Sequence, residues 1–72
     1  MGKFKMTETT VYEIRVRDVL DEKWAAYFVP FTLTIGEYES IFTGPVHDQA
    51  ELFGVLLKIR DLGLKLVSVK SV

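Results

Sequence analysis

The strongest structural signal in this chain is one long amphipathic segment with a recognisable start and end, residues 47–63 (HDQAELFGVLLKIRDLG). Asp48 is followed three residues later by Glu51, which resembles a capping box with Asp in the place of Ser or Thr. Gly63 comes just after the last apolar position, where a residue in the left-handed conformation commonly ends a helix. A single wide apolar stripe runs between these signals, made of Leu52, Val55, Leu56, Ile59 and Leu62. The segment predicts the long helix of the fold.

The two ends of the chain predict strands. Residues 11–20 (VYEIRVRDVL) alternate, with Tyr12, Ile14 and Val16 on one face and charged side chains on the other. A period of two residues is typical of a half-buried strand with one wet face. The closing segment LKLVSVKSV is rich in β-branched residues and predicts the last strand.

The middle of the chain predicts a hairpin over residues 31–44. FTLTIG alternates, a turn follows, and SIFTG forms a second short strand that Gly44-Pro45 is expected to break. The register of this third strand stays open, because Ile41 and Phe42 are adjacent and only one of them can face the core.

A short helix precedes the hairpin. Asp21 is a suitable N-cap for EKWAAYF, and Trp24 and Phe28, spaced i and i+4, are expected to share a face. Pro30 ends the helix, because the residue before a proline is driven out of the α region.

The resulting order of strand, helix, strand, strand, helix, strand predicts an α+β, ferredoxin-like β-α-β-β-α-β fold. In that fold two helices cover one face of a four-stranded antiparallel sheet, and the opposite face is open. We expect residues 1–10 to be a flexible N-terminal tail and residues 11–72 to be a single domain.

Length and composition set the limits of this fold. A chain of 72 residues buries only ~60% of its unfolded surface, and without cysteine no disulfide can add stability. A homodimer would relieve the shortage of core. The formal charge of −1 argues against nucleic acid as a partner held by a strongly positive field. Neither a signal-peptide core nor an apolar run of ~18 residues is present, so we expect a soluble, cytoplasmic protein without a membrane partner.

From Tyr12 onward the chain resembles a widespread family of small uncharacterised bacterial and archaeal proteins. The motif that carries the resemblance is GPVHDQAELFGVLLKIRDLGLKLVSV, residues 44–69, with YEIRV, LDEKWAAYF and LTI as supporting pieces. The resemblance covers most of the chain but implies no activity.

Catalytic chemistry finds little support in the residues. His47, the only histidine, is either a general base held by Asp48 or a loop residue beside a helix cap, and we favour the loop residue. Ser40 and Ser68 lack the flanking residues of a nucleophile elbow. One histidine and scattered carboxylates form no metal-ligand spacing. We therefore predict no catalytic, cofactor-binding or metal-binding residue.

The open sheet face is the first candidate binding surface. Arg15 and Arg17 would lie on it, joined by Lys65 or Lys70 from the last strand, and Phe42 could supply one exposed aromatic ring. Nucleic-acid binding at this face is an alternative function, although the RNA-recognition signature is absent and a solvated sheet face explains the same residues.

The long helix offers a second candidate surface. Phe53 and Leu57 lie outside the centre of the apolar stripe, and Gly54 leaves room for the close approach of another backbone. These residues either pack against the first helix, through Trp24 and Phe28, or form an interface with a second copy of the chain. The leading hypothesis is a non-enzymatic interaction module that self-associates. A small enzyme with its pocket at a dimer boundary, near His47 and Asp48, is the weaker alternative.

Overall fold

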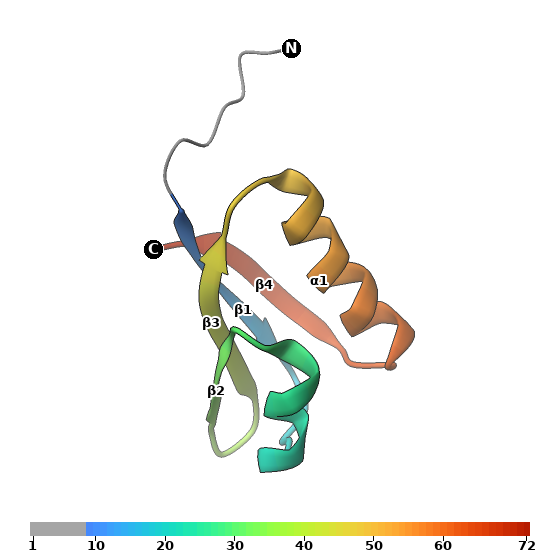
Figure 1. Cartoon of the computed structure of the whole chain (residues 1–72). Coiled ribbons are helices and arrows are strands. Elements are labelled where there is room, and N and C mark those ends of the chain that lie inside the picture. Colours follow the sequence, from blue (N-terminus) through green and yellow to red (C-terminus); the bar gives the residue numbers. More distant parts are fainter. Residues whose placement is uncertain (1–8) are drawn as a thin grey trace.

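The computed structural model describes residues 9–72, which form a four-stranded antiparallel sheet and two helices (Figure 1). The elements are β1 (Thr10–Val16), the 3-10 helix η1 (Glu22–Phe28), β2 (Thr32–Ile35), β3 (Ser40–Val46), α1 (Gln49–Asp61) and β4 (Leu66–Ser71). The chain is thus of the α+β class, and its elements come in the predicted order. Of the predicted tail, residues 1–8 lie outside the described residues, and Thr10 already belongs to β1, where it pairs with Val46.

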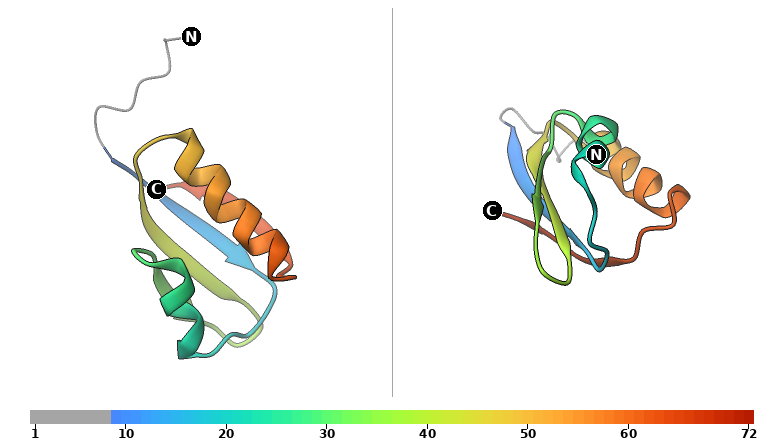
Figure 2. Two further views of the ribbon diagram at one scale, coloured as in Figure 1. Left: turned by 45° about the vertical axis from the view of Figure 1, so that its right-hand side comes forward. Right: turned by 90° about the horizontal axis from the view of Figure 1, so that it is seen from below.

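The strands lie in the order β2-β3-β1-β4, and every neighbouring pair is antiparallel. The two central strands are therefore β3 and β1, whereas β2 and β4 form the edges. Both helices lie on the same face of the sheet, with η1 on the β2 side and α1 on the β4 side (Figures 1 and 2).

The core lies between that sheet face and the helices. Its fully or almost fully buried side chains are Ile14, Val16, Leu20, Phe28, Phe31, Phe42, Val46 and Ile59. The ring centroids of Phe28 and Phe42 are 4.3 Å apart, so η1 is joined to the central strand by an aromatic contact. The sequence predicted both the inward positions of β1 and the buried side of α1, since hydrophobic periodicity selects them directly.

The third strand differs from the prediction in two ways. Phe42 points into the core and pairs with Ile14 and Leu33 across the sheet, while its neighbour Ile41 takes the open face. The proposed exposed aromatic ring at Phe42 is therefore wrong. β3 also continues through Gly44 and Pro45 instead of ending there.

The strand tolerates Pro45 because β2 stops short of it. The last pair between the two strands joins Thr32 and Thr43, so no strand lies on the β2 side of Pro45 and no ladder hydrogen bond is lost. Gly44 is required by a close approach. A Cβ atom added there would lie 2.9 Å from the Cα atom of Phe31.

The predicted helix boundaries are confirmed. The carboxylate of Asp48 accepts the N–H of Glu51 at 2.9 Å, and the carboxylate of Glu51 accepts the N–H of His47 at 2.7 Å. This is a capping box whose return bond reaches one residue further back than usual. At the other end Gly63 has φ +77, and the N–H of Leu64 donates to the carbonyl of Ile59, as in a Schellman motif. Asp21 caps η1 by accepting the N–H of Lys23.

Candidate functional site

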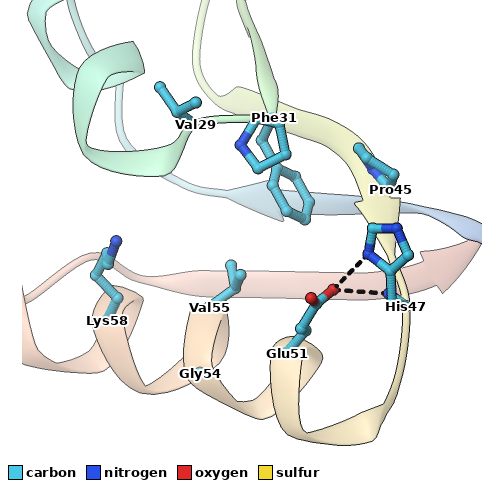
Figure 3. Close-up of a pocket in the computed structure, with 9 residues that line it drawn as sticks. Val29, Phe31, Pro45, His47, Glu51, Gly54, Val55 and Lys58 are labelled. Carbon is cyan, nitrogen blue, oxygen red and sulfur yellow. Dashed lines mark hydrogen bonds and ion pairs between the residues drawn. The ribbon is translucent and has the colours of Figure 1, made fainter.

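A groove of about 410 Å³ lies between the end of η1 and α1 (Figure 3). Its lining residues are Val29, Pro30, Phe31, Pro45, His47, Glu51, Gly54, Val55 and Lys58. The side chains from η1's exit and β3 are apolar. The polar ones are His47, just before α1, Glu51 in its first turn and Lys58 in its last turn. The size and the mostly apolar lining suit a small-molecule pocket.

The polar side chains of the groove are already engaged in local structure. His47 Nδ1 lies 3.0 Å from Glu51 Oε1, the oxygen that also accepts the His47 N–H. These contacts, the backbone hydrogen bond above all, hold the pKa of Glu51 below its ordinary value of 4.5. Lys58 donates to the carbonyl of Tyr27 at 2.6 Å and lies 5.4 Å from the ring centroid of Phe28. The charged side chains of the groove thus stabilise the start of α1, through Glu51, and its contact with η1, through Lys58.

The structure does not pair His47 with Asp48, the two residues on which the enzyme hypothesis depends. His47 does line a groove, but its carboxylate partner is Glu51, because Asp48 is occupied as the helix cap. Among the residues that line the groove, none carries a hydroxyl or thiol group that a His–Glu pair could activate. Across residues 9–72, no cluster of three His, Cys, Asp or Glu side chains could hold a metal ion.

Of the three predicted interface residues of α1, only Gly54 lines the groove. Gly54 faces the groove, where an added Cβ atom would meet nothing within 4 Å. Phe53 and Leu57 do not line the groove; they remain 55% and 49% exposed. η1 therefore does not cover them, although its Phe28 is fully buried and Trp24 packs against the core.

The edge strand β4 exposes two apolar residues that the sequence analysis missed. Leu66 and Val67, at the start of the edge strand β4, are 48% and 43% exposed. The sequence contained a signal for them, because Leu66 and Val67 are adjacent and a strict alternation cannot bury both. In the structure, the strand has a register irregularity at this point, opposite Val16.

The open sheet face is more nearly neutral than its arginines suggested. Arg15 contacts Glu39 at 2.7 Å and Glu13 at 3.5 Å, and Lys70 also lies 3.5 Å from Glu13. Arg17 lies just beyond β1 and, with Lys65, Leu66 and Val67, lines a separate shallow hollow of about 360 Å³. The two arginines therefore have different surroundings. A phosphate group would have to compete with two carboxylates for Arg15.

Comparison with known proteins places the chain in a family. Residues 11–70 match the family model described as "Domain of unknown function (DUF8691)". The chain belongs to the DUF8691 family. No curated protein and no solved structure matches it. In this DUF8691 domain the matched range includes the groove, the exposed flank of α1 and nearly all of β4.

Within the described residues, neither helix of the DUF8691 domain has the length and apolar composition needed to cross a bilayer.

Proposed function

We propose that this DUF8691 domain is a non-enzymatic interaction module that self-associates as a homodimer through the exposed flank of α1. The observation that carries the proposal is the half-exposure of Phe53 and Leu57, one helical turn apart on α1, together with the exposure of Leu66 and Val67 at the start of the edge strand β4. We call these four side chains the α1–β4 patch. Exposed apolar side chains in such number on a small protein often mark an interaction site.

The size of the core supports the proposal. Within residues 9–72 only eight apolar side chains are buried, whereas the α1–β4 patch leaves two leucines, one valine and one phenylalanine in contact with water. Small domains without disulfides or metals commonly gain the missing stability from oligomerisation.

The energetics indicate that more than the helix flank is needed. Complete burial of one such side chain is worth roughly 1.5–3 kcal/mol, so covering the exposed half of Phe53 and Leu57 in two copies yields about 3–6 kcal/mol. Association itself costs on the order of 4–15 kcal/mol. A stable dimer therefore has to use the neighbouring β4 surface as well.

We also infer that the fold is ferredoxin-like. The supporting observation is that β3 lies between β1 and β2 and is antiparallel to both, which leaves β1 and β2 parallel and joined through η1. This is the arrangement of a split β-α-β unit. Two copies of such a sheet can join at their edges.

Sedimentation equilibrium tests the proposed self-association. The wild-type chain is expected to have the mass of a dimer at high micromolar concentration, and the double variant Phe53→Ser, Leu57→Ser the mass of a monomer. Tyr38→Ser is the matched control, because Tyr38 is 77% exposed but lies in the turn between β2 and β3.

Circular dichroism of both variants checks that the fold is retained, since neither change removes a core side chain. A wild-type chain that stays strictly monomeric at high micromolar concentration would contradict the proposal. So would a Phe53→Ser, Leu57→Ser variant that dimerises as well as the wild type.

A further inference from the structure

The backbone groups of β4 alternate between the sheet and its free edge. The N–H of Val72 donates to the carbonyl of Val11 at 2.9 Å, which identifies this pair as hydrogen-bonded. In an antiparallel ladder every second pair is hydrogen-bonded, so Lys70 and Ser68 also direct their backbone groups toward β1. It follows that Val69 and Ser71 direct their N–H and C=O groups away from the sheet.

Nothing in the described structure protects this edge. β4 is the terminal strand of the sheet, has six residues and contains no proline. Its single charged side chain, Lys70, lies near Glu13 on the open face. Edge strands that remain single usually carry charges, prolines or a covering segment, because their free backbone groups are a template for another strand.

We propose that β4 pairs in antiparallel fashion with β4 of a second copy, across a two-fold axis at Val69, so that the two sheets become one sheet of eight strands. The inference rests on the proposed homodimer and specifies how its two copies meet. In this register Val69 lies opposite its own copy, Ser71 opposite Val67, and Lys70 opposite Ser68. The outward backbone groups of Val69 and Ser71 gain partners.

The neighbouring registers are less favourable for stated reasons. An axis at Lys70 sets this ammonium group directly opposite its own copy, and like charges at facing positions destabilise a strand pair. An axis at Ser68 sets Ser71 opposite Lys65. The carbonyl of Lys65 is turned toward β1, where it accepts the N–H of Arg17 at 2.7 Å.

The same axis brings the two α1 helices together. η1 lies over the β2 side of the sheet, and Lys58 reaches it from the near side of α1 (Figure 2). At 100° per residue, Phe53 lies about 140° from Lys58, on the side of α1 away from η1. Leu57 lies about 160° from the buried Ile59, on the outer surface of the helix. Strand pairing at the β4 edge turns the sides of the two α1 helices that lie away from η1, with Phe53, toward each other. The interface then combines backbone hydrogen bonds with apolar burial, as in other edge-to-edge assemblies.

Disulfide trapping tests the register, because the chain has no cysteine of its own. Val69→Cys places two thiols on facing residues, with Cα atoms ~5.5 Å apart, which suits a disulfide. Val67→Cys on the same edge places them ~13 Å apart. Thr34→Cys, on the exposed part of β2, measures cross-linking by random collision. Under mild oxidation we expect Val69→Cys to form covalent dimers at least tenfold faster than either control.

A second variant does not disturb the core. Ser71→Pro removes an outward N–H but no ladder hydrogen bond to β1, and Ser71 is exposed. It should raise the dimer dissociation constant by at least tenfold, while the monomer retains its circular dichroism spectrum.

The outcomes separate the two proposals. A dimer that survives Ser71→Pro unchanged, and in which Val69→Cys cross-links no faster than Thr34→Cys, would overturn the strand pairing and leave self-association standing. A wild-type monomer at high micromolar concentration would overturn both. Preferential cross-linking of Val67→Cys would show that a different register is used.

Discussion

The two edges of the sheet are finished in different ways. The β2 edge is short, four residues, and η1 packs beside it with Phe28 buried against Phe42. The β4 edge is longer and begins with two exposed apolar residues. On the same side of the sheet, Phe53 and Leu57 of α1 remain about half exposed. The β2 edge is therefore covered by a helix that is packed on the core, whereas the β4 edge has exposed apolar side chains, and it is this edge that we propose as the interface.

The two helices differ in length and in how much of their apolar surface is buried. η1 has seven residues and lies over β2, where the buried Phe28 and the adjoining Phe31 fill the space above β3. α1 has thirteen residues, of which Ile59 is fully buried. Phe53 and Leu57 lie about 120° and 160° from Ile59 around the helix, and both remain about half exposed.

The largest expected effect contrasts the two halves directly. Phe42→Ala should destabilise the monomer by about 3–5 kcal/mol, since it removes a fully buried ring from the centre of the core. Leu57→Ala, on the exposed flank, should change the monomer's stability by no more than about 0.5 kcal/mol. Urea denaturation at low micromolar concentration measures both. Similar losses for the two variants would show that the α1 flank is part of the monomer core.

A glycine pair sharpens the contrast. Gly44→Ala should cost about 1–3 kcal/mol or more, because the added Cβ would meet the Cα of Phe31 at 2.9 Å and the ring at 2.7 Å. Because one of the contacted atoms is the backbone Cα of Phe31, a side-chain rotation alone cannot relieve the clash. Thermal unfolding of this variant should show a clearly lower midpoint, and an unchanged midpoint would contradict the tight packing between β3 and the start of β2.

The opposite sign is expected at Gly54. Gly54→Ala should stabilise the monomer by about 0.5–1 kcal/mol, since the Cβ has open space and glycine is a poor residue within a helix. The same denaturation series checks this value. If Gly54→Ala destabilises the chain at dimer-forming concentrations only, the groove side of α1 also takes part in association.

The smallest expected effect concerns the start of α1 and depends on pH. The folded-state pKa of Glu51 is lowered by its hydrogen bonds with His47, so its stabilising contribution is present above pH 4.5 and declines as the pH falls through the lowered value. Glu51→Gln should lose this contribution and show a weaker acid dependence of stability than the wild type. Identical pH profiles between pH 3 and 7, measured by urea denaturation, would contradict the role of the His47–Glu51 contact.

The sequence predicted those parts of the fold that local chemistry determines. Asp48 and Glu51 identified the start of α1, Gly63 its end, and the alternation at Ile14 and Val16 the inner face of β1. The third strand was harder, because the two candidates for its inward position, Ile41 and Phe42, are adjacent and both apolar. Only pairing with β1 and β2 decides that Phe42 is the buried one.

The candidate surfaces were predicted less well, and for a physical reason. Helical spacing showed that Phe53 and Leu57 lie off the centre of the apolar stripe. It could not show that Gly54 lines a groove and they do not, because the groove exists only where η1 lies near α1. The neutralisation of Arg15 depends on Glu39, which lies 24 positions away in the sequence and comes close only through the hairpin. Contacts of this kind are set by tertiary structure and leave no local pattern.

Amide hydrogen exchange of the unmodified chain tests the central claim most directly. The N–H of Gly36 donates to the carbonyl of Glu39, so by alternation the amides of Leu33 and Ile35 point outward from the sheet at its β2 edge. The amide of Val69 points outward in the same way at the β4 edge. We expect the Val69 amide to exchange more slowly as the protein concentration rises, while Leu33 and Ile35 exchange rapidly throughout. Rapid exchange of Val69 at every concentration, equal to that of Leu33, would contradict the assignment of the β4 edge as the interface.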